Sequence, residues 1–531
     1  MSSPTLTSTA APPVGVGKTT FKSPPQSHRG KTIILILAAI VICMVVGLAL
    51  AWDRIWPFTE KAVVEDLAEA SDSTVTIRSS RRTYFPAPGC ILEGIEFHHG
   101  PDHWTLITID KLTIQGSYLG IISKHVPRIT AEGGHVFIPP FGHNVTFTTQ
   151  HSNLVVDEII ANGTVVEFAR NDPSNKPVRF EVQQGLLHDV EWSRPIAYDL
   201  KFHNPEPPGE IATRGKFGAW IKGNPGETPI SGEYTFDGAD LSVFRGIAGT
   251  LASKGKYGGL LKHIDIAGTT EIPDFEVKSG GHKIKLVTQY SAYVDAVHGD
   301  TFLQRVDADF GRTHLIVEGS IAGGPGRKGK IALLDLTSRH GRIEDILGMF
   351  VKTPRSPMTG AVALKAKAEI PPGKERFLER VKLHGTFGID EGNFSKPETQ
   401  KNVNELSAGA RGEKMEDAET VVTDLKGTVA MEGGVADFSD ISFGVPGAEA
   451  RMYGTYNLLN EKIDLHGRMR VDTKISKTTT GMKALLLKAI DPLFKKKKKG
   501  EVVPIHMTGT YEHPQYGLDL TKPKDPAQAS K

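Results

Sequence analysis

The chain has 531 residues, with 63 Lys and Arg against 61 Asp and Glu, for a formal net charge of +2. Binding to nucleic-acid phosphates needs a clear cationic excess, so this balance argues against nucleic acid as a partner. A chain of this length usually folds as several domains or as a repeating array that grows along one axis. The 56 Gly and 33 Pro residues indicate frequent turns.

The first segment is a polar tail followed by an apolar run. Residues 1–31 are rich in Ser, Thr, Pro and Gly, which predicts a disordered tail. Residues 33–51 are uncharged and apolar, and about 20 helical residues cross the hydrocarbon core of a bilayer. We therefore predict a transmembrane anchor over residues 32–52. The anchor residues are Ile33, Leu37, Val41, Val45, Leu48 and Trp52.

The flanks of the apolar run predict its orientation. Upstream lie the cations Lys18, Lys22, Arg29 and Lys31, with no acid among them. The positive-inside rule then places the N-terminus in the cytoplasm and the body across the membrane. The competing interpretation is a cleavable signal peptide, because Ala49-Leu50-Ala51 resembles a cleavage site. The apolar run is longer than a signal core, and the region before it is unusually long, which favours the anchor.

Strict alternation of apolar and polar residues dominates the body. The apolar positions that share one side of their strands include Ile284, Leu286, Leu315, Val317, Ile463, Leu465, Met469 and Val471. Strands with one dry and one wet face are typical of antiparallel sheets. Turn signals are expected at Asp237-Gly238, Glu391-Gly392-Asn393, Gly433-Gly434 and residues 457–460.

Three stretches have helical spacing instead. Ile343, Ile346, Leu347 and Phe350 fall at i, i+3, i+4 and i+7. A broad apolar stripe covers residues 482–493, and a weaker helix is expected over residues 58–70. The strands could form stacked sandwiches, or one long curved sheet whose apolar face needs a ligand or partner. Periodicity leaves both arrangements open.

Several segments resemble, in chain order, the AsmA-like family of bacterial envelope proteins. They cover residues 342–345, 357–364, 385–394, 403–412 (with a Leu406-Ser407 pair), 443–467 and 504–520, and more loosely residues 84–97. The resemblance implies an elongated, curved antiparallel β-sheet of the repeating β-groove type with a few short helices. It also implies an inner-membrane anchor, an N-terminal β-rich periplasmic region over residues 53–330, an AsmA-like C-terminal region over residues 331–520 and a tail over residues 521–531.

No residue cluster predicts catalysis. Residues 324–330 match a phosphate-loop spacing, but Ile331 replaces the required Ser or Thr, and residues 13–19 lack the first glycine. His98, His99, Asp102 and His103 could suggest a zinc site, but a solvated turn is favoured there. The sequence therefore predicts no enzyme, no metal and no cofactor.

A basic helix near the C-terminus is a candidate for contact with a membrane surface. Its residues are Leu485, Leu486, Ile490, Phe494, Lys495, Lys496 and Lys497. Such a helix can lie on anionic lipid head groups. The alternatives are a solvated charged loop, or a helix that caps the end of a groove.

By the family resemblance, the expected function is to bind or conduct phospholipid, or another acyl-chain lipid, between the inner and outer membranes. Other envelope proteins are possible partners. The alternative is a non-enzymatic assembly factor for outer-membrane protein biogenesis, whose strand edges pair with a client strand. Co-purified phospholipid would distinguish the first from the second.

Overall fold

The computed structural model describes residues 42, 46, 56–71, 73–99, 104–118, 120, 125–138, 155–169, 177–191, 194–219, 221, 224–278, 281–296, 298–323, 329–351, 353–411, 422–471, 501–510 and 512–519. Most of the predicted anchor and the predicted surface helix at residues 485–497 lie outside these ranges; within the anchor, Ile42 and Val46 are helical. Within the described ranges, no helix is long and apolar enough to cross a membrane. The chain divides into two compact units, Met1–Thr59 and Glu60–Lys531.

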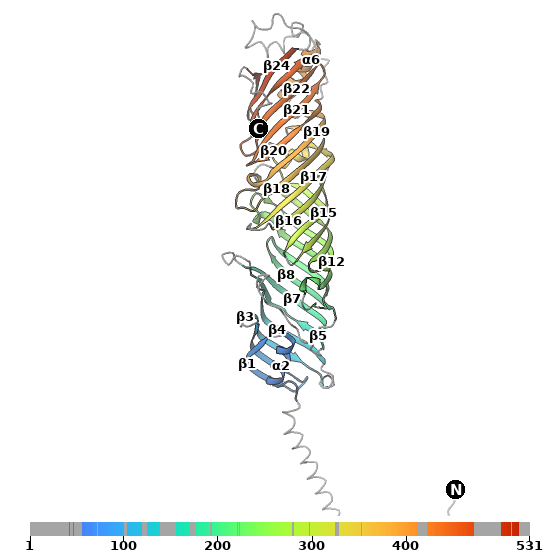
Figure 1. Cartoon of the computed structure of the whole chain (residues 1–531), viewed down its shortest axis with the longest axis vertical. Helices are drawn as coiled ribbons and strands as arrows, with labels where there is room; N and C mark the ends of the chain where they lie inside the picture. Colours follow the sequence, from blue (N-terminus) through green and yellow to red (C-terminus); the bar gives the residue numbers. More distant parts are fainter. Residues whose placement is uncertain are drawn as a thin grey trace, which may run out of the picture. The chain divides into compact units, whose positions relative to one another are not determined.

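The second unit is built on one sheet of 25 strands, which confirms the expected mainly β, antiparallel fold with few helices (Figure 1). The first ten strands are β1 (Thr74–Thr83), β2 (Gly89–His99), β3 (Trp104–Gln115), β4 (His125–Ile138), β5 (Val155–Ile160), β6 (Thr164–Phe168), β7 (Val178–Val190), β8 (Ile196–Pro205), β9 (Pro208–Phe217) and β10 (Pro229–Asp240). The next nine are β11 (Ile247–Ala248), β12 (Thr250–Leu260), β13 (His263–Val277), β14 (Ile284–Asp295), β15 (Asp300–Phe310), β16 (Thr313–Gly323), β17 (Lys330–Arg342), β18 (Met358–Ile370) and β19 (Lys382–Phe394). The last six are β20 (Thr423–Glu432), β21 (Val435–Val445), β22 (Ala448–Asn457), β23 (Lys462–Val471), β24 (Glu501–Thr510) and β25 (Pro514–Leu518).

The strands succeed one another along the sheet in nearly chain order. β1 to β4 form one antiparallel meander, and β7 to β25 form another, in which the two-residue β11 pairs only with β13. Between them, β5 and β6 pair parallel to the two halves of β4 and antiparallel to β7. Parallel neighbours need a connection of a dozen or more residues, and residues 139–154 join β4 to β5. Within the described part of the sheet, the parallel pairings are found at this junction.

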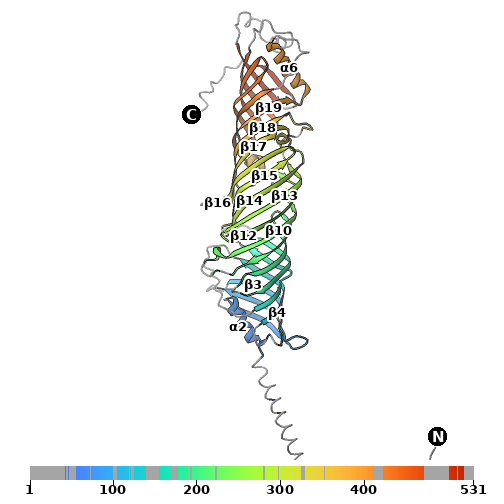
Figure 2. The ribbon, with the colours of Figure 1, turned by 90° about the vertical axis from the view of Figure 1, so that its right-hand side faces the viewer.

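The helices lie against limited parts of this sheet. They are α2 (Glu60–Ser71), α4 (Ile343–Gly348), α5 (Phe377–Arg380) and α6 (Pro397–Arg411), with the 3-10 turns η1 (Pro225–Glu227) and η2 (Leu241–Val243). Figure 2 shows α2 beside the first strands and α6 beside the last ones. α2 contacts β1, α4 contacts β17 and β18, and α6 contacts β19 and β22. The helices expected at residues 58–70 and 343–350 are thus confirmed as α2 and α4.

The turn signals have mixed outcomes. Gly433-Gly434 and residues 457–460 do connect antiparallel strands. The turns expected at Asp237-Gly238 and Glu391-Gly392 are wrong, because both lie inside strands, at irregularities of β10 and β19. Gly238 and Glu391 have φ of 66° and 54°. A bulge uses the same left-handed backbone as a tight turn, so it gives the same sequence signal.

Candidate functional site

A row of uncharged residues crosses the sheet from β2 to β25 through directly paired positions. In order these are Cys90, Ile114, Ile129, Ile159, Leu187, Tyr198, Gly215, Gly232, Tyr257, Ile266, Ala292, Leu303, Gly319, Leu334, Ala368, Leu383, Met431, Ala436, Tyr456, Ile463, Gly509 and Pro514. Residues paired across strands point to the same side of a sheet. We call this side the apolar face.

The opposite side of the sheet is charged. Next to the apolar row, Asp335 pairs with Lys367, and their side chains form an ion pair of 2.6 Å. Lys285 of β14 makes a similar ion pair with Glu271. The sheet therefore separates one wet face from one apolar face over most of its length.

The middle strands hold both buried and half-buried side chains on the apolar face, and Ile272 and Phe310, which pair with Leu286, are buried. Leu286, Leu315 and Val317 are half-buried, as is Ile284 at the start of β14. The helices pack mainly on β1, β17 to β19 and β22, within the described part of the chain. Four of the predicted groove residues thus lie on the middle strands of the apolar face and are partly exposed.

The other predicted groove residues lie in a different environment. Met469 is only 1% exposed and packs with Val422, Val445, Ala448 and Val503. Val403 of α6 also contacts this cluster. Ile463 is buried as well, Leu465 is half-buried, and Val471 pairs with Ala448 at the end of β23. Met469 is therefore a core residue that packs near α6. We call Met469 and its four buried neighbours the helix-covered cluster.

Two rows with the pattern Tyr-Gly-Gly-Tyr cross β8 to β14 on the apolar face. One runs Tyr198, Gly215, Gly232, Tyr257 and the other runs Tyr234, Gly255, Gly268, Tyr290. A Cβ on Gly215 would lie 2.7 Å from the hydroxyl of Tyr198, and one on Gly268 would lie 2.8 Å from that of Tyr290. The tyrosine rings therefore lie over the glycines. A side chain at these glycine positions would collide with the tyrosines.

The hydroxyls of the first row form a chain of hydrogen bonds with one direction. Thr213 Oγ1 donates to the carbonyl of Glu233 at 2.9 Å, so it must accept from Tyr257 at 2.7 Å. Tyr257 in turn accepts from Tyr198 at 2.5 Å. Burial, together with the contact to Tyr257, raises the pKa of Tyr198 well above its usual value. Every donor in this chain is therefore satisfied by the protein itself.

The second row is satisfied in the same way. The hydroxyls of Tyr234 and Tyr290 contact each other, and they lie 3.2 and 3.3 Å from Ser253 Oγ. Ser253 donates to the carbonyl of Thr269 at 3.1 Å. Burial raises the pKa of Tyr290, so this hydroxyl also stays neutral. The polar atoms on the apolar face thus bond to one another and require no polar ligand.

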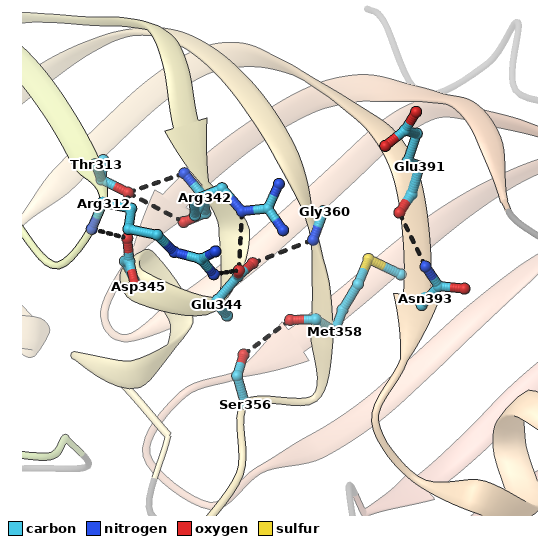
Figure 3. A network of polar contacts seen from close by, with 10 residues as sticks. All are labelled: Arg312, Thr313, Arg342, Glu344, Asp345, Ser356, Met358, Gly360, Glu391 and Asn393. Atoms are coloured by element: carbon cyan, nitrogen blue, oxygen red, sulfur yellow. Dashed lines mark hydrogen bonds and ion pairs between the residues drawn. The ribbon is translucent and has the colours of Figure 1, made fainter.

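A polar network holds α4 at the rim of the sheet (Figure 3). Glu344 accepts hydrogen bonds from Arg342 Nε at 2.9 Å, Arg312 Nη2 at 2.6 Å and the Gly360 backbone N–H at 3.1 Å. Asp345 accepts from the Thr313 hydroxyl at 2.9 Å. Burial pushes the pKa of Glu344 upward, but the hydrogen bonds outweigh it and hold the pKa below its usual value. The apolar side of α4, with Ile343, Ile346 and Leu347, packs beside Val362 and Ile389.

Of the remaining sequence candidates, Asp102, His103 and residues 13–19 lie outside the described residues. Within the described residues, no group of three or more His, Cys, Asp and Glu is arranged to hold a metal ion. His98 instead contacts Thr105 at 3.0 Å and Glu96 at 3.4 Å. Gly323 pairs with Lys330 in antiparallel strands, and residues 324–328 between them lie outside the described residues. Cys90 is free and buried, and burial raises the pKa of its thiol to about 12.

Sequence reasoning missed α6 and the tyrosine rows. Pro397 near the first turn and Glu398 beside it are typical helix-start signals. The Leu406-Ser407 pair falls in this helix, and Ser407 donates to the Pro446 carbonyl at 2.9 Å. The tyrosine rows have no local signal, since only the pairing of distant strands brings them together.

No known protein family, no curated protein and no solved structure matches this chain.

Proposed function

We propose that this protein binds the acyl chains of phospholipids along its apolar face, while an inner-membrane anchor holds its body in the periplasm of a cell envelope. The observation that carries the proposal is the uncharged row from β2 to β25, half-buried in its middle strands. Monomeric soluble proteins rarely leave a contiguous apolar surface larger than a few hundred Å² without a ligand or partner. An extended apolar row therefore favours an extended apolar ligand.

Acyl chains fit the chemistry of this face. They make no hydrogen bonds, and the hydroxyls of the two tyrosine rows need none from a ligand. Neighbouring strands lie about 4.8 Å apart, so the row follows a path on the order of 100 Å along the sheet. Several lipids could lie along such a path, with the sheet curved around them as a groove. Contacts of this kind discriminate weakly between chain lengths, so binding would be loose in specificity.

The test uses neighbouring residues that point to opposite faces of the sheet. A photoreactive p-benzoylphenylalanine replaces Leu286 or Val317 on the apolar face of the full-length protein, or Lys285 or Glu318 on the charged face. After illumination in the envelope, mass spectrometry identifies what is attached. The expected result is phospholipid at positions 286 and 317 and none at 285 and 318.

Other outcomes have clear meanings. Adducts with a protein client at any of the four positions, without lipid, would favour the assembly-factor alternative. Equal lipid labelling on both faces would contradict the proposal, because the label would then report only general contact with membrane. The Val317→Asp variant adds a second check, since a charge on the face should abolish lipid labelling at position 286.

A further inference from the structure

The first strands of the sheet end in a group of exposed aromatic residues. Tyr84, Phe85 and Tyr118 are 44%, 89% and 53% exposed. Tyr84 and Phe85 lie between β1 and β2, and Tyr118 lies just after β3. The Tyr118 hydroxyl donates to the Tyr84 carbonyl, which holds the two connections side by side. We call these three residues the aromatic edge.

Cations lie directly beside the aromatic edge. Arg81 and Arg82 precede Tyr84 in β1, and both are exposed. Aromatic rings are enriched at the boundary between lipid head groups and acyl chains, because they are partly apolar and partly polar. Arginines beside them can contact the lipid phosphates. Val243 and Phe244 are also exposed, beside Arg245, but they lie far along the chain from the predicted anchor. Leu333 and Val502 are exposed without an aromatic neighbour in the strand sequence. Single exposed residues of that kind are normal on a protein surface.

The chain enters the sheet at this same end. Glu60, the first residue of α2, accepts a hydrogen bond from Ser80 Oγ at 2.6 Å, only four residues before Tyr84. α2 then runs back along β1. Just after its end, Ser73 contacts His99 at the other end of β2. Residues 52–59 separate Glu60 from the predicted apolar run, and this segment spans about 30 Å even when fully extended. The length of this segment therefore allows the aromatic edge to meet a bilayer that would hold the predicted anchor.

We propose that the aromatic edge docks into the head-group layer of this membrane, with Phe85 and the two tyrosines inserted and the arginines on anionic phosphates. The proposal rests on the anchored, periplasmic arrangement proposed above. It adds a second point of attachment besides the predicted helix. A second contact fixes the first strands against the bilayer surface, so the apolar face begins where lipids leave the membrane.

The experiment uses the full chain in vesicles of phosphatidylcholine and phosphatidylglycerol. One variant carries Phe85→p-benzoylphenylalanine, and the matched control carries Thr105→p-benzoylphenylalanine. Thr105 is also exposed, in β3, but at the opposite end of the same strands. The proposal expects abundant lipid adducts at position 85 and few at position 105. It also expects the adducts at position 85 to fall when phosphatidylglycerol is omitted.

Each contrary outcome overturns the docking proposal. Equal labelling at the two positions would show that the anchor alone brings the body near the vesicle. Release of the chain from vesicles by an alkaline wash would show that it has no membrane-spanning anchor, on which the proposal rests. Labelling of Leu286→p-benzoylphenylalanine in the same vesicles reports the apolar face separately. Lipid at position 286 without lipid at position 85 would thus sink the docking surface and leave the lipid-binding function intact.

Discussion

Leu286 and Met469 lie on the same apolar face, yet their surroundings differ. Met469 belongs to the helix-covered cluster and is closed off from water beneath Val403 of α6. Leu286 lies on the middle strands and stays half-buried, although Ile272 and Phe310, which pair with it, are buried. One alternating pattern therefore yields two environments, a fully buried core and a partly exposed surface. The difference comes from what packs against the face, because the strands themselves are built alike.

This contrast separates stability from binding. Residues of the helix-covered cluster stabilise the folded state, because folding alone removes their side chains from water. Half-buried residues of the middle strands gain only part of this stabilisation within the chain. Changes to the two regions should therefore have different consequences, which can be measured side by side.

The largest expected effect follows a charge placed in the helix-covered cluster. Met469→Asp would bury a carboxylate with no partner, at a cost of about 3–5 kcal/mol in the free energy of unfolding. Val317→Asp places the same charge where water can reach it, and we expect a cost of about 1 kcal/mol. Denaturant unfolding of the two variants measures the comparison. Equal losses of stability would mean that the middle strands are as closed as the C-terminal ones.

Sequence reasoning recovers much of the fold but little of this contrast. Alternation correctly separates the two faces, as with Lys285 on the charged face and Leu286 on the apolar face. It carries no information on coverage, because α6 reaches the helix-covered cluster from residues far along the chain. The turn signals fail for a different reason. Gly433-Gly434 and Asp237-Gly238 look alike locally, and only strand pairing decides between a turn and a bulge.

The next effect tests the glycines beneath the tyrosines. A Cβ on Gly232 would lie 2.6 Å from both the Tyr257 hydroxyl and the carbonyl oxygen of Arg214. The backbone carbonyl cannot move aside easily, so Gly232→Ala should destabilise by about 1–3 kcal/mol. Gly258→Ala is the matched control, since its nearest neighbour would be Ser231 Cβ at 3.7 Å. A change of less than about 0.5 kcal/mol is expected there, and thermal unfolding checks both variants.

A smaller effect tests the direction of the hydroxyl chain. Tyr198 begins the chain, so Tyr198→Phe leaves no donor unsatisfied and should cost about 1 kcal/mol. Tyr257→Phe removes the acceptor of Tyr198 and should cost about 1–3 kcal/mol, because a buried donor loses its partner. The order of the two losses is the decisive result. If Tyr198→Phe were the more harmful change, the hydrogen bonds would run the other way.

The smallest effect concerns pH at the α4 rim. The pKa of Glu344 is lowered in the folded state by its hydrogen bonds from Gly360 and Arg342, so its ionised form stabilises the fold. That stabilisation is complete above the ordinary glutamate pKa of about 4.3 and is lost as pH falls through the lowered value. Amide hydrogen exchange in α4, corrected for the intrinsic effect of pH, should therefore show less protection in acid. Glu344→Gln should lower protection near neutral pH and remove this acid dependence, whereas the exposed Glu318→Gln should leave it unchanged. If Glu344→Gln kept the full acid effect, another group would be its cause. The network that Arg312 and Arg342 form around Glu344 would then not stabilise α4.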